Sequence, residues 1–235
     1  MTKHLVIDEM QDYTPVQYAV LNEMFRCPKT ILGDFGQRLN PNHLHTLKDI
    51  RRMYKSAEFV MLNKSYRSTY EIISFARRIC PNDLLEAMER HGEEPQVFAC
   101  GDRQAQIGRI REEVQSFEER RKKEKSASMG IILKTDRDAE AMYDALARQC
   151  KVTLISPEST GFSNGVSITS VRMAKGLEFD EVVVADADKN TYGAEFDSGL
   201  LYVACTRAMH RLTVIGVGEL VAVSYTHLRA HETKA

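Results

Sequence analysis

Short apolar runs and longer amphipathic segments alternate along almost the whole chain. Runs such as HLVI (4–7) and MGIIL (129–133) predict buried strands, whereas apolar residues spaced three or four apart at 15–25 and 136–149 predict helices. We expect the remaining elements in this order: strands at 29–33 and 58–62, a helix at 68–79 capped by Ser68 with Glu71, a strand at 96–100, a long charged helix ending near Lys125, strands at 151–155, 166–171 and 181–187, a helix at 197–210 and a strand at 211–216. This alternation indicates an α/β fold with mostly parallel sheets.

Composition is that of a soluble globular protein of one large or two small domains. The 235 residues are 43% hydrophobic and 28% charged, and the 32 Lys and Arg residues nearly balance the 33 Asp and Glu residues. The basic excess of a protein held on nucleic acid by charge alone is therefore missing, and any such contact must be local. The run EERRKKEK (118–125) mixes both signs and reads as a solvated helix end.

The cysteines and the lengths of the apolar runs indicate the cellular compartment to expect for this protein. Five scattered cysteines without a C-x-x-C pair argue against a disulfide framework or a zinc site. No apolar run approaches the roughly 20 residues of a membrane span, and the N-terminus lacks the layout of a signal peptide. We expect a reduced, cytoplasmic protein with no membrane partner.

Two polar clusters follow the first two expected strands. Asp8 and Glu9 come directly after HLVI, and Gln37 ends the turn LGDFGQ (32–37) after the next strand. Ligands of parallel sheets bind at the carboxyl ends of strands, where Asp8 could hold Mg²⁺, Glu9 could take a proton from water and Gln37 could sense a γ-phosphate. The alternatives are an ordinary acidic helix cap and a plain Gly-Asp turn.

Two further clusters offer arginines near helix ends. NKSYRST (63–69) places Tyr66, which can stack on a base, beside Arg67, whose planar fork suits phosphate oxygens. LLYVACTRAMHRL (200–212) places Arg207 on an expected helix. The alternatives are a structural arginine at a helix cap and a surface arginine.

The stretch ITSVRMAKGLEFDEVVV (168–184) reads as a strand, a Lys-Gly turn and a second strand. Glu178 can accept hydrogen bonds from ribose hydroxyls, while Arg172 and Lys175 can meet backbone phosphates. A simple β-turn between two strands is the alternative.

All five clusters occur in one fixed order, and in that order the chain resembles the UvrD/Rep-type superfamily-1 helicases from residue 4 to about 216. VIDEMQD resembles their Walker B motif, GDFGQ motif III, NKSYRST motif IV, RMAKGLEFD motif V and LLYVACTRA motif VI. The wording of AKGLEFD and YVACTRAMH is most similar to the helicase-IV/HelD-like branch, some members of which act on RNA polymerase.

The resemblance implies a RecA-like P-loop NTPase fold in which ATP with Mg²⁺ lies between two RecA-like domains. Asp8 and Glu9 would hold the metal, Glu9 would activate water, and Gln37 would sense the γ-phosphate. In the second domain, Tyr66 would stack on adenine, and Glu178 with Gly176 would bind the ribose. Arg67 and Arg207 would act as arginine fingers. Single-stranded nucleic acid would be met by Thr169, Arg172 and Lys175.

The chain also departs from the family pattern. None of its thirteen glycines is followed by lysine, so the G-x-x-x-x-G-K-[ST] phosphate loop, which the family places upstream of Walker B, does not occur. We therefore expect a partial first RecA-like domain at 1–56, a complete second one at 57–218, and a tail at 219–235 whose composition is also consistent with non-native sequence.

Two more departures concern unwinding. The family's motif III continues to an aromatic residue that stacks on a DNA base, whereas here RLNPNH follows GDFGQ and the chain has no Trp, which puts base-by-base unwinding in doubt. Only about 100 residues separate motifs IV and V, too few for the large inserted subdomain of processive helicases.

The sequence thus predicts the C-terminal part of an ATP-dependent DNA helicase or translocase, inactive alone, whose partners are single-stranded DNA and the missing N-terminal part of the same protein. The alternative is a non-catalytic RecA-like module that docks on a protein partner such as RNA polymerase. Presence of all the expected catalytic residues, Asp8, Glu9, Gln37, Arg67 and Arg207, counts against that alternative.

Overall fold

The structure is a computed structural model whose chain divides into two compact units, Met1–Leu62 and Asn63–Ala235. This division falls a few residues beyond the predicted boundary at 56/57. The described residues are 2–34, 37, 39, 47–62, 64–80, 86–87, 89–122, 127–159, 164–194 and 196–221.

Unit 1 is built on two parallel strands, β1 (Leu5–Ile7) and β2 (Lys29–Ile31), which pair in register from Leu5↔Lys29 to Ile7↔Ile31. The turn η1 (Met10–Asp12) and helix α1 (Pro15–Met24) connect them, and α2 (Leu47–Met53) follows. A capping box between Thr14 and Gln17 starts α1.

The core of unit 1 is small and centred on an aromatic side chain. Tyr18 of α1 is fully buried between Ile7 and Ile50, and its hydroxyl donates to the Met10 carbonyl at 2.8 Å. Burial raises the pKa of this hydroxyl above its usual range, so it stays a donor at physiological pH. The bond ties α1 to the segment directly after β1.

The prediction of a strand at 58–62 is wrong. These residues form no strand, and Val60 and Leu62 are 78% and 88% exposed. An apolar run becomes a strand only where a neighbouring strand accepts its hydrogen bonds, and the described part of unit 1 offers none at this point.

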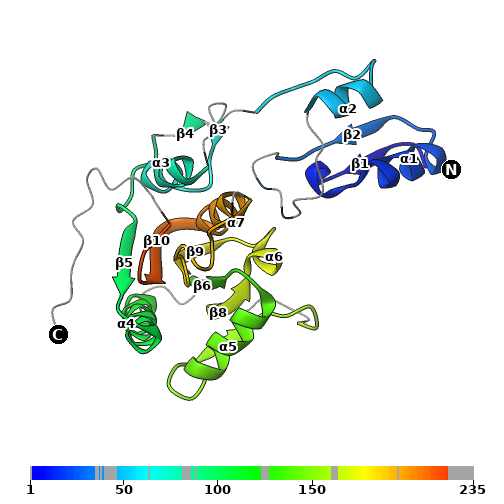
Figure 1. Ribbon diagram of the computed structural model, residues 1–235. Helices are drawn as coiled ribbons and strands as arrows, with labels where there is room; N and C mark the ends of the chain where they lie inside the picture. The colour runs from blue at the N-terminus through cyan, green and yellow to red at the C-terminus, as the bar shows by residue number, and fades with distance from the viewer. Residues whose placement is uncertain are drawn as a thin grey trace. The chain divides into compact units, whose positions relative to one another are not determined.

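Unit 2 contains a six-stranded sheet in which all strands are parallel, in the order β5-β10-β9-β6-β8-β7 (Figure 1). Its strands are β5 (Gln96–Cys100), β6 (Ser128–Leu133), β7 (Val152–Leu154), β8 (Gly165–Ser170), β9 (Phe179–Val184) and β10 (Ala208–Val217). A separate pair, β3 (Lys64–Ser65) and β4 (Glu86–Ala87), is also parallel. The predicted α/β fold with parallel sheets is confirmed.

Helices cover both faces of this sheet. On one face lie α4 (Arg103–Arg121) and α5 (Asp136–Leu146), and on the other α3 (Tyr70–Ile79) and α7 (Asp197–Cys205), as Figure 1 shows. The central strands are buried on both sides, which is why they read as continuous apolar runs. The main core contains side chains from both helices and strands. They are Ile110, Val114 and Phe117 of α4, Met142 of α5, Ile131 of β6, Ile168 of β8, Val183 of β9 and Ile215 of β10.

The eight residues 171–178 return the chain across the sheet. They begin with a short helix, α6 (Val171–Ala174), at the carboxyl end of β8 and lead to the amino end of β9. Gly176 in this crossover has φ +85°, in the left-handed region that favours glycine. Motif V thus runs from one edge of the sheet to the other.

Two helix boundaries differ from prediction. Helix α3 starts at Tyr70 with Thr69 at its N-cap, and neither Ser68 nor Glu71 forms the expected cap. The Ser68 hydroxyl instead donates to the Ala208 carbonyl at 2.6 Å, so a tertiary bond takes the group that local capping would use.

The helix predicted at 197–210 ends at Cys205. Residues from Ala208 onward belong to β10, because Ala208 pairs with Phe179 of β9 and sheet pairing overrides helical periodicity there.

The start of the predicted tail is bonded to unit 2. Lys189 N–H donates to the Glu219 carbonyl at 2.9 Å, and Leu220 is 7% exposed. The rest of the tail, 222–235, lies outside the described residues. Across the helices that the structure describes, each is too short or too polar to span a lipid bilayer.

Candidate functional site

The carboxyl end of β1 holds Asp8 and Glu9 in a fixed local geometry. Glu9 has φ 52°, an uncommon left-handed conformation for a residue with a side chain, and its N–H donates to Asp8 Oδ1 at 2.8 Å. Its Oε2 atom accepts a bond of 2.5 Å from the amide of Gln11, which is 1% exposed. Such strain concentrates at functional positions, where surrounding contacts over-determine the backbone.

The same Gln11 connects this segment to the turn after β2. Its Oε1 atom accepts a bond from Asp34 N–H at 3.0 Å, and the Gln37 amide donates to Asp34 Oδ2 at 3.0 Å. A Cβ on Gly33 would lie 2.4 Å from Gln11 Oε1 and 2.8 Å from the Met10 nitrogen, so this turn needs glycine. Three predicted residues of unit 1 therefore share one edge, and Gln11, which the sequence analysis did not single out, holds them together.

Two adjacent carboxylates fit a magnesium site that a nucleotide completes. Mg²⁺ in nucleotide-dependent enzymes is commonly held by one or two carboxylates plus water and phosphate oxygens rather than by an all-protein cage. Within the described ranges no group of three or more His, Cys, Asp or Glu side chains could hold a metal, and the exposed Asp8 with Glu9 matches the open arrangement.

In unit 2 the expected nucleotide residues converge at the amino edge of the six-stranded sheet. Arg67 Nε lies 2.5 Å from Glu178 Oε1, which directly precedes β9. Arg207 directly precedes β10, and its carbonyl accepts a bond from Phe179 N–H at 3.0 Å. The Ser68 hydroxyl also donates to the Ala208 carbonyl. Residues of motifs IV, V and VI therefore lie together at this edge, although up to 140 residues separate them in sequence.

Arg207 is not the surface arginine of the alternative reading, since it is 2% exposed. It also lies after the end of α7 rather than within a helix. Its Nε donates to the Val203 carbonyl at 3.2 Å, and Nη2 lies 3.5 Å from Thr206 Oγ1. Tyr66, in contrast, is 68% exposed and presents an open ring for stacking.

Arg90 and His210 belong to this edge and were not anticipated from sequence. Arg90 Nη1 donates to the Arg67 carbonyl at 3.0 Å, and Nη2 lies 2.9 Å from His210 Nδ1 and 3.3 Å from His210 Nε2. The Arg90 carbonyl accepts a bond from Tyr70 N–H at 2.8 Å. Residue 90 lies far from every motif in sequence, so only the fold reveals that it braces Arg67.

The residues expected to meet nucleic acid lie near the carboxyl end of β8 and along the crossover. Arg172 on α6 is exposed and Lys175 ends that helix. Thr169 differs from expectation because it is fully buried within β8, and its hydroxyl has no hydrogen-bond partner among the described residues. Its place on an inner strand between β6 and β7 explains this burial.

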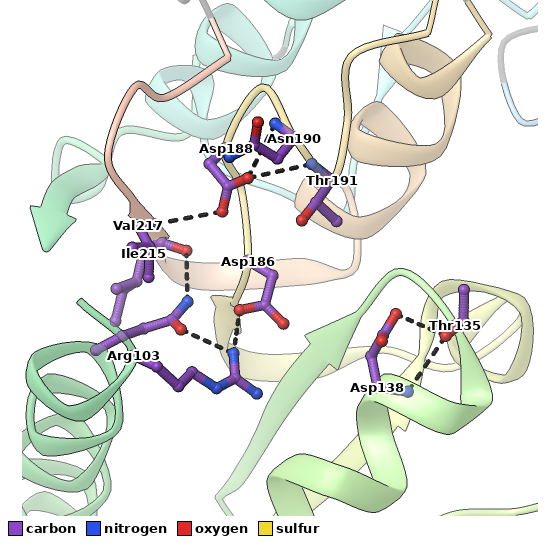
Figure 2. Close-up of polar contacts among 10 residues, drawn as sticks. Arg103, Thr135, Asp138, Asp186, Asp188, Asn190, Thr191, Ile215 and Val217 are labelled. Atoms are coloured by element: carbon purple, nitrogen blue, oxygen red, sulfur yellow. Dashed lines mark hydrogen bonds and ion pairs between the residues drawn. The ribbon is translucent and has the colours of Figure 1, made fainter. Parts of the chain in front are cut away.

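The carboxyl edge of β9 and β10 is occupied by internal bonds (Figure 2). Arg103 pairs with Asp186, while Asp188 accepts backbone N–H bonds from Asn190 and Thr191 at 3.1 Å and from Val217 at 3.3 Å. Ligands of α/β sheets usually bind at this edge, but here its polar groups order a loop.

Comparisons with known proteins find relatives of this chain among the helicases. A family model described as the UvrD-like helicase C-terminal domain matches residues 165–215, from β8 to β10. The crystal structure of the C-terminal domain of a possible DNA helicase from Lactobacillus plantarum WCFS1 is 36% identical and superposes with a TM-score of 0.57, covering 66% of this chain and 89% of that one. The chain belongs to the UvrD-like helicases. It carries the C-terminal helicase domain of that family.

Two curated relatives are much longer than the matched region. The ATP-dependent DNA helicase UvrD2 of Mycobacterium tuberculosis H37Rv is 35% identical over 82 residues, which are 32% of this chain and 11% of that protein. YjcD of Bacillus subtilis 168, which carries the name of an ATP-dependent DNA helicase, is 25% identical over 162 residues, 61% of this chain and 20% of YjcD. This UvrD-like chain spans only a small part of either relative, and its place in the helicase-IV/HelD-like branch stays a prediction.

Proposed function

We propose that this chain is the C-terminal part of an ATP-dependent helicase or translocase that moves along single-stranded DNA. The observation that carries the proposal is the placement of Arg67, Glu178 and Arg207 at one sheet edge, where Arg67 pairs with Glu178 and the Arg207 carbonyl accepts a bond from Phe179. A guanidinium and a carboxylate from distant motifs suit a nucleotide, whose phosphates need planar cationic donors and whose ribose needs an acceptor.

Each unit would contribute its own groups to nucleotide handling. In unit 1, Asp8 would hold Mg²⁺, and the Glu9 carboxylate, fixed by Gln11, would accept the proton of the attacking water. Gln37 would sense the γ-phosphate. Bound ATP supplies the phosphoanhydride whose hydrolysis drives movement.

In unit 2, the exposed Tyr66 ring would stack on adenine and Glu178 would accept the ribose hydroxyls, with Gly176 leaving room for close approach. The guanidinium groups of Arg67 and Arg207 would stabilise negative charge that develops during phosphoryl transfer.

DNA binding would occur along the crossover, where Arg172 and Lys175 can contact backbone phosphates. Because the crossover ends at Glu178, one short segment would connect the DNA-facing and nucleotide-facing edges of unit 2. Contacts of this kind fix position on a strand without reading its sequence, as a translocase requires.

The alternative, a module docking on RNA polymerase, has no use for the strained Glu9 and its buried Gln11 clamp. ATP hydrolysis by the chain alone and by the complete protein, each with and without single-stranded DNA, separates the two functions. We expect the chain alone to show background hydrolysis only, because no loop in it supplies the amides and lysine that hold β- and γ-phosphates.

The complete protein should hydrolyse ATP faster with DNA, and Glu9→Gln should remove that stimulation. A complete protein that carries a phosphate loop yet shows no DNA-stimulated hydrolysis would support the binding module instead. Turnover of about 1 s⁻¹ by the chain alone would contradict our inference that the chain lacks the phosphate loop.

A further inference from the structure

Arg172, the most exposed of the residues expected to contact DNA, is held by a carboxylate of its own domain. Its Nη2 atom lies 2.6 Å from Asp136 Oδ2. Asp136 is the first residue of α5 and follows the carboxyl end of β6, next to β8 in the sheet. The Ser170 hydroxyl, 1% exposed, donates to Asp136 Oδ1.

One carboxylate therefore accepts bonds from a hydroxyl and from a guanidinium. Both are among the side-chain donors that proteins commonly use for the phosphates of nucleic acids. Ser170 also accepts a bond from Met173 N–H at 3.2 Å, which fixes its position at the start of α6. Both donors thus point at one anionic group.

We propose that Asp136 occupies the place of a nucleic-acid phosphate in the free protein and restrains binding by Arg172. The inference rests on the proposed function, in which this crossover contacts single-stranded DNA. A phosphate that reaches Arg172 would displace the Asp136 carboxylate, and Arg172 would exchange one anionic partner for another.

The exposure of the pair makes this exchange feasible. The Arg172 and Asp136 side chains are 62% and 39% exposed, so water and salt screen their attraction. Exposed ion pairs contribute little to stability, and the competition should change affinity by a small factor rather than by orders of magnitude.

The test measures binding of a fluorescent oligodeoxythymidylate to the chain by anisotropy across a salt series. Asp136→Asn removes the competing charge but keeps an oxygen that can accept from Ser170. Asp144→Asn is the matched control, since Asp144 is exposed on the same helix and has none of the ion pairs found among the described residues. The double variant Asp136→Asn/Arg172→Ala removes the released arginine as well.

We expect Asp136→Asn to lower the oligonucleotide Kd about two- to fivefold relative to Asp144→Asn. The slope of log K against log salt should not change, because Arg172 contacts a phosphate in both proteins. The double variant should lose the gain in affinity, and its slope should become shallower by about 0.7, the value for one phosphate contact on a single strand.

Unchanged or weaker binding by Asp136→Asn would overturn the inference, as would a gain that survives in the double variant. Absence of binding by every variant would reject both the inference and the DNA contact of this domain, whereas the ATP hydrolysis experiment tests the nucleotide half of the proposed function independently.

A second measurement uses the unaltered chain. Saturation with oligonucleotide should raise the pKa of the Asp136 carboxyl, followed by ¹³C NMR, because that carboxyl loses its guanidinium partner. An unchanged pKa at saturation would contradict displacement.

Discussion

The two units of this chain place their nucleotide-motif residues at opposite ends of parallel strands. In unit 1, Asp8, Glu9 and Gln37 follow β1 and β2 at the carboxyl edge. In unit 2, Glu178 and Arg207 precede β9 and β10 at the amino edge, and the opposite edge is filled by the bonds of Asp186 and Asp188.

The difference shows how distance in sequence limits prediction. The site of unit 1 is assembled by contacts between segments close in sequence, such as Gln11 with Asp34, which are 23 residues apart. The site of unit 2 depends on pairs such as Ser68 and Ala208, separated by 140 residues. Motifs that are close in sequence can be placed together from the order of the strands along the chain. Motifs that are distant in sequence can be placed only when the pairing of the strands in the sheet is known.

The largest expected effect concerns the two arginines of the amino edge. In the complete helicase of which we propose this chain to be part, Arg67→Ala or Arg207→Ala should lower kcat at least about a hundredfold and change nucleotide Kd less than about tenfold. The reason is that their charge acts mainly in the transition state. Lysine should rescue neither, since a point charge does not reproduce the planar fork.

Single-turnover hydrolysis and equilibrium nucleotide binding measure these two quantities. Arg148→Ala is the control, because Arg148 is exposed and takes part in none of the ion pairs found among the described residues. Near-normal hydrolysis in either test variant removes that arginine from the site.

Two glycines sharpen the comparison of the units. Gly33→Ala should destabilise unit 1 by about 1–3 kcal/mol, since its Cβ would meet Gln11 and the Met10 backbone. Gly176→Ala should cost unit 2 about 1–2 kcal/mol through left-handed strain alone, because its Cβ would meet nothing within 4 Å.

Hydrogen exchange read separately for peptides of each unit checks both glycine substitutions. Gly108→Ala, inside α4 with open space around its Cβ, should instead stabilise unit 2 by about 0.5–1 kcal/mol. If Gly33→Ala reduced the hydrogen-exchange protection of both units equally, the contact of Gly33 with Gln11 and Met10 would not act on unit 1 alone.

The buried bond across motifs IV and VI should matter more than a typical surface serine. Ser68→Ala leaves the Ala208 carbonyl without its donor and should cost unit 2 about 1–2 kcal/mol in urea unfolding. Ser116→Ala, exposed on α4, should stay within about 0.5 kcal/mol of the unaltered chain. If the two variants unfold at the same urea concentration, the Ser68 bond contributes nothing to the stability of unit 2.

The smallest effect is a pH dependence at Asp136. The Ser170 hydrogen bond lowers its pKa below the ordinary 3.8, and Arg172 adds to this against the opposing effect of desolvation. A carboxyl with a lower pKa in the folded state stabilises the fold above pH 3.8 and loses that contribution as pH falls through the lowered value.

The difference in free energy of unfolding between the unaltered chain and Asp136→Asn, measured by thermal melts, should therefore be constant above about pH 5 and shrink below pH 3.8. Its size should be under about 1 kcal/mol because the pair is exposed. A difference that grows toward low pH would show that the carboxylate is not favoured by its neighbours.

Much of the fold could be predicted from the sequence. Strands buried on both faces read as apolar runs, and β5 begins and ends at the predicted residues. The misses have tertiary causes: 58–62 lacks a partner strand, and Ser68 bonds to β10 instead of capping α3.

The site could be predicted only in part. Motif order predicts roles for Arg67, Glu178 and Arg207, but neither the edge they share nor the burial of Arg207 and Thr169 follows from local pattern. Arg90 lies outside the motifs, and His210 lies within YVACTRAMH without a sign of its role, since their contacts exist only once β10 lies beside the start of α3.

Hydrogen exchange of the complete helicase, with and without a non-hydrolysable ATP analogue, tests the central claim most directly. We expect added protection at residues 66–70, 178–181 and 205–209, where motifs IV, V and VI meet at the amino edge. Residues 186–191 at the opposite edge should not change. Protection confined to 186–191, or none in the three motif segments, would contradict the assignment of the amino edge to the nucleotide.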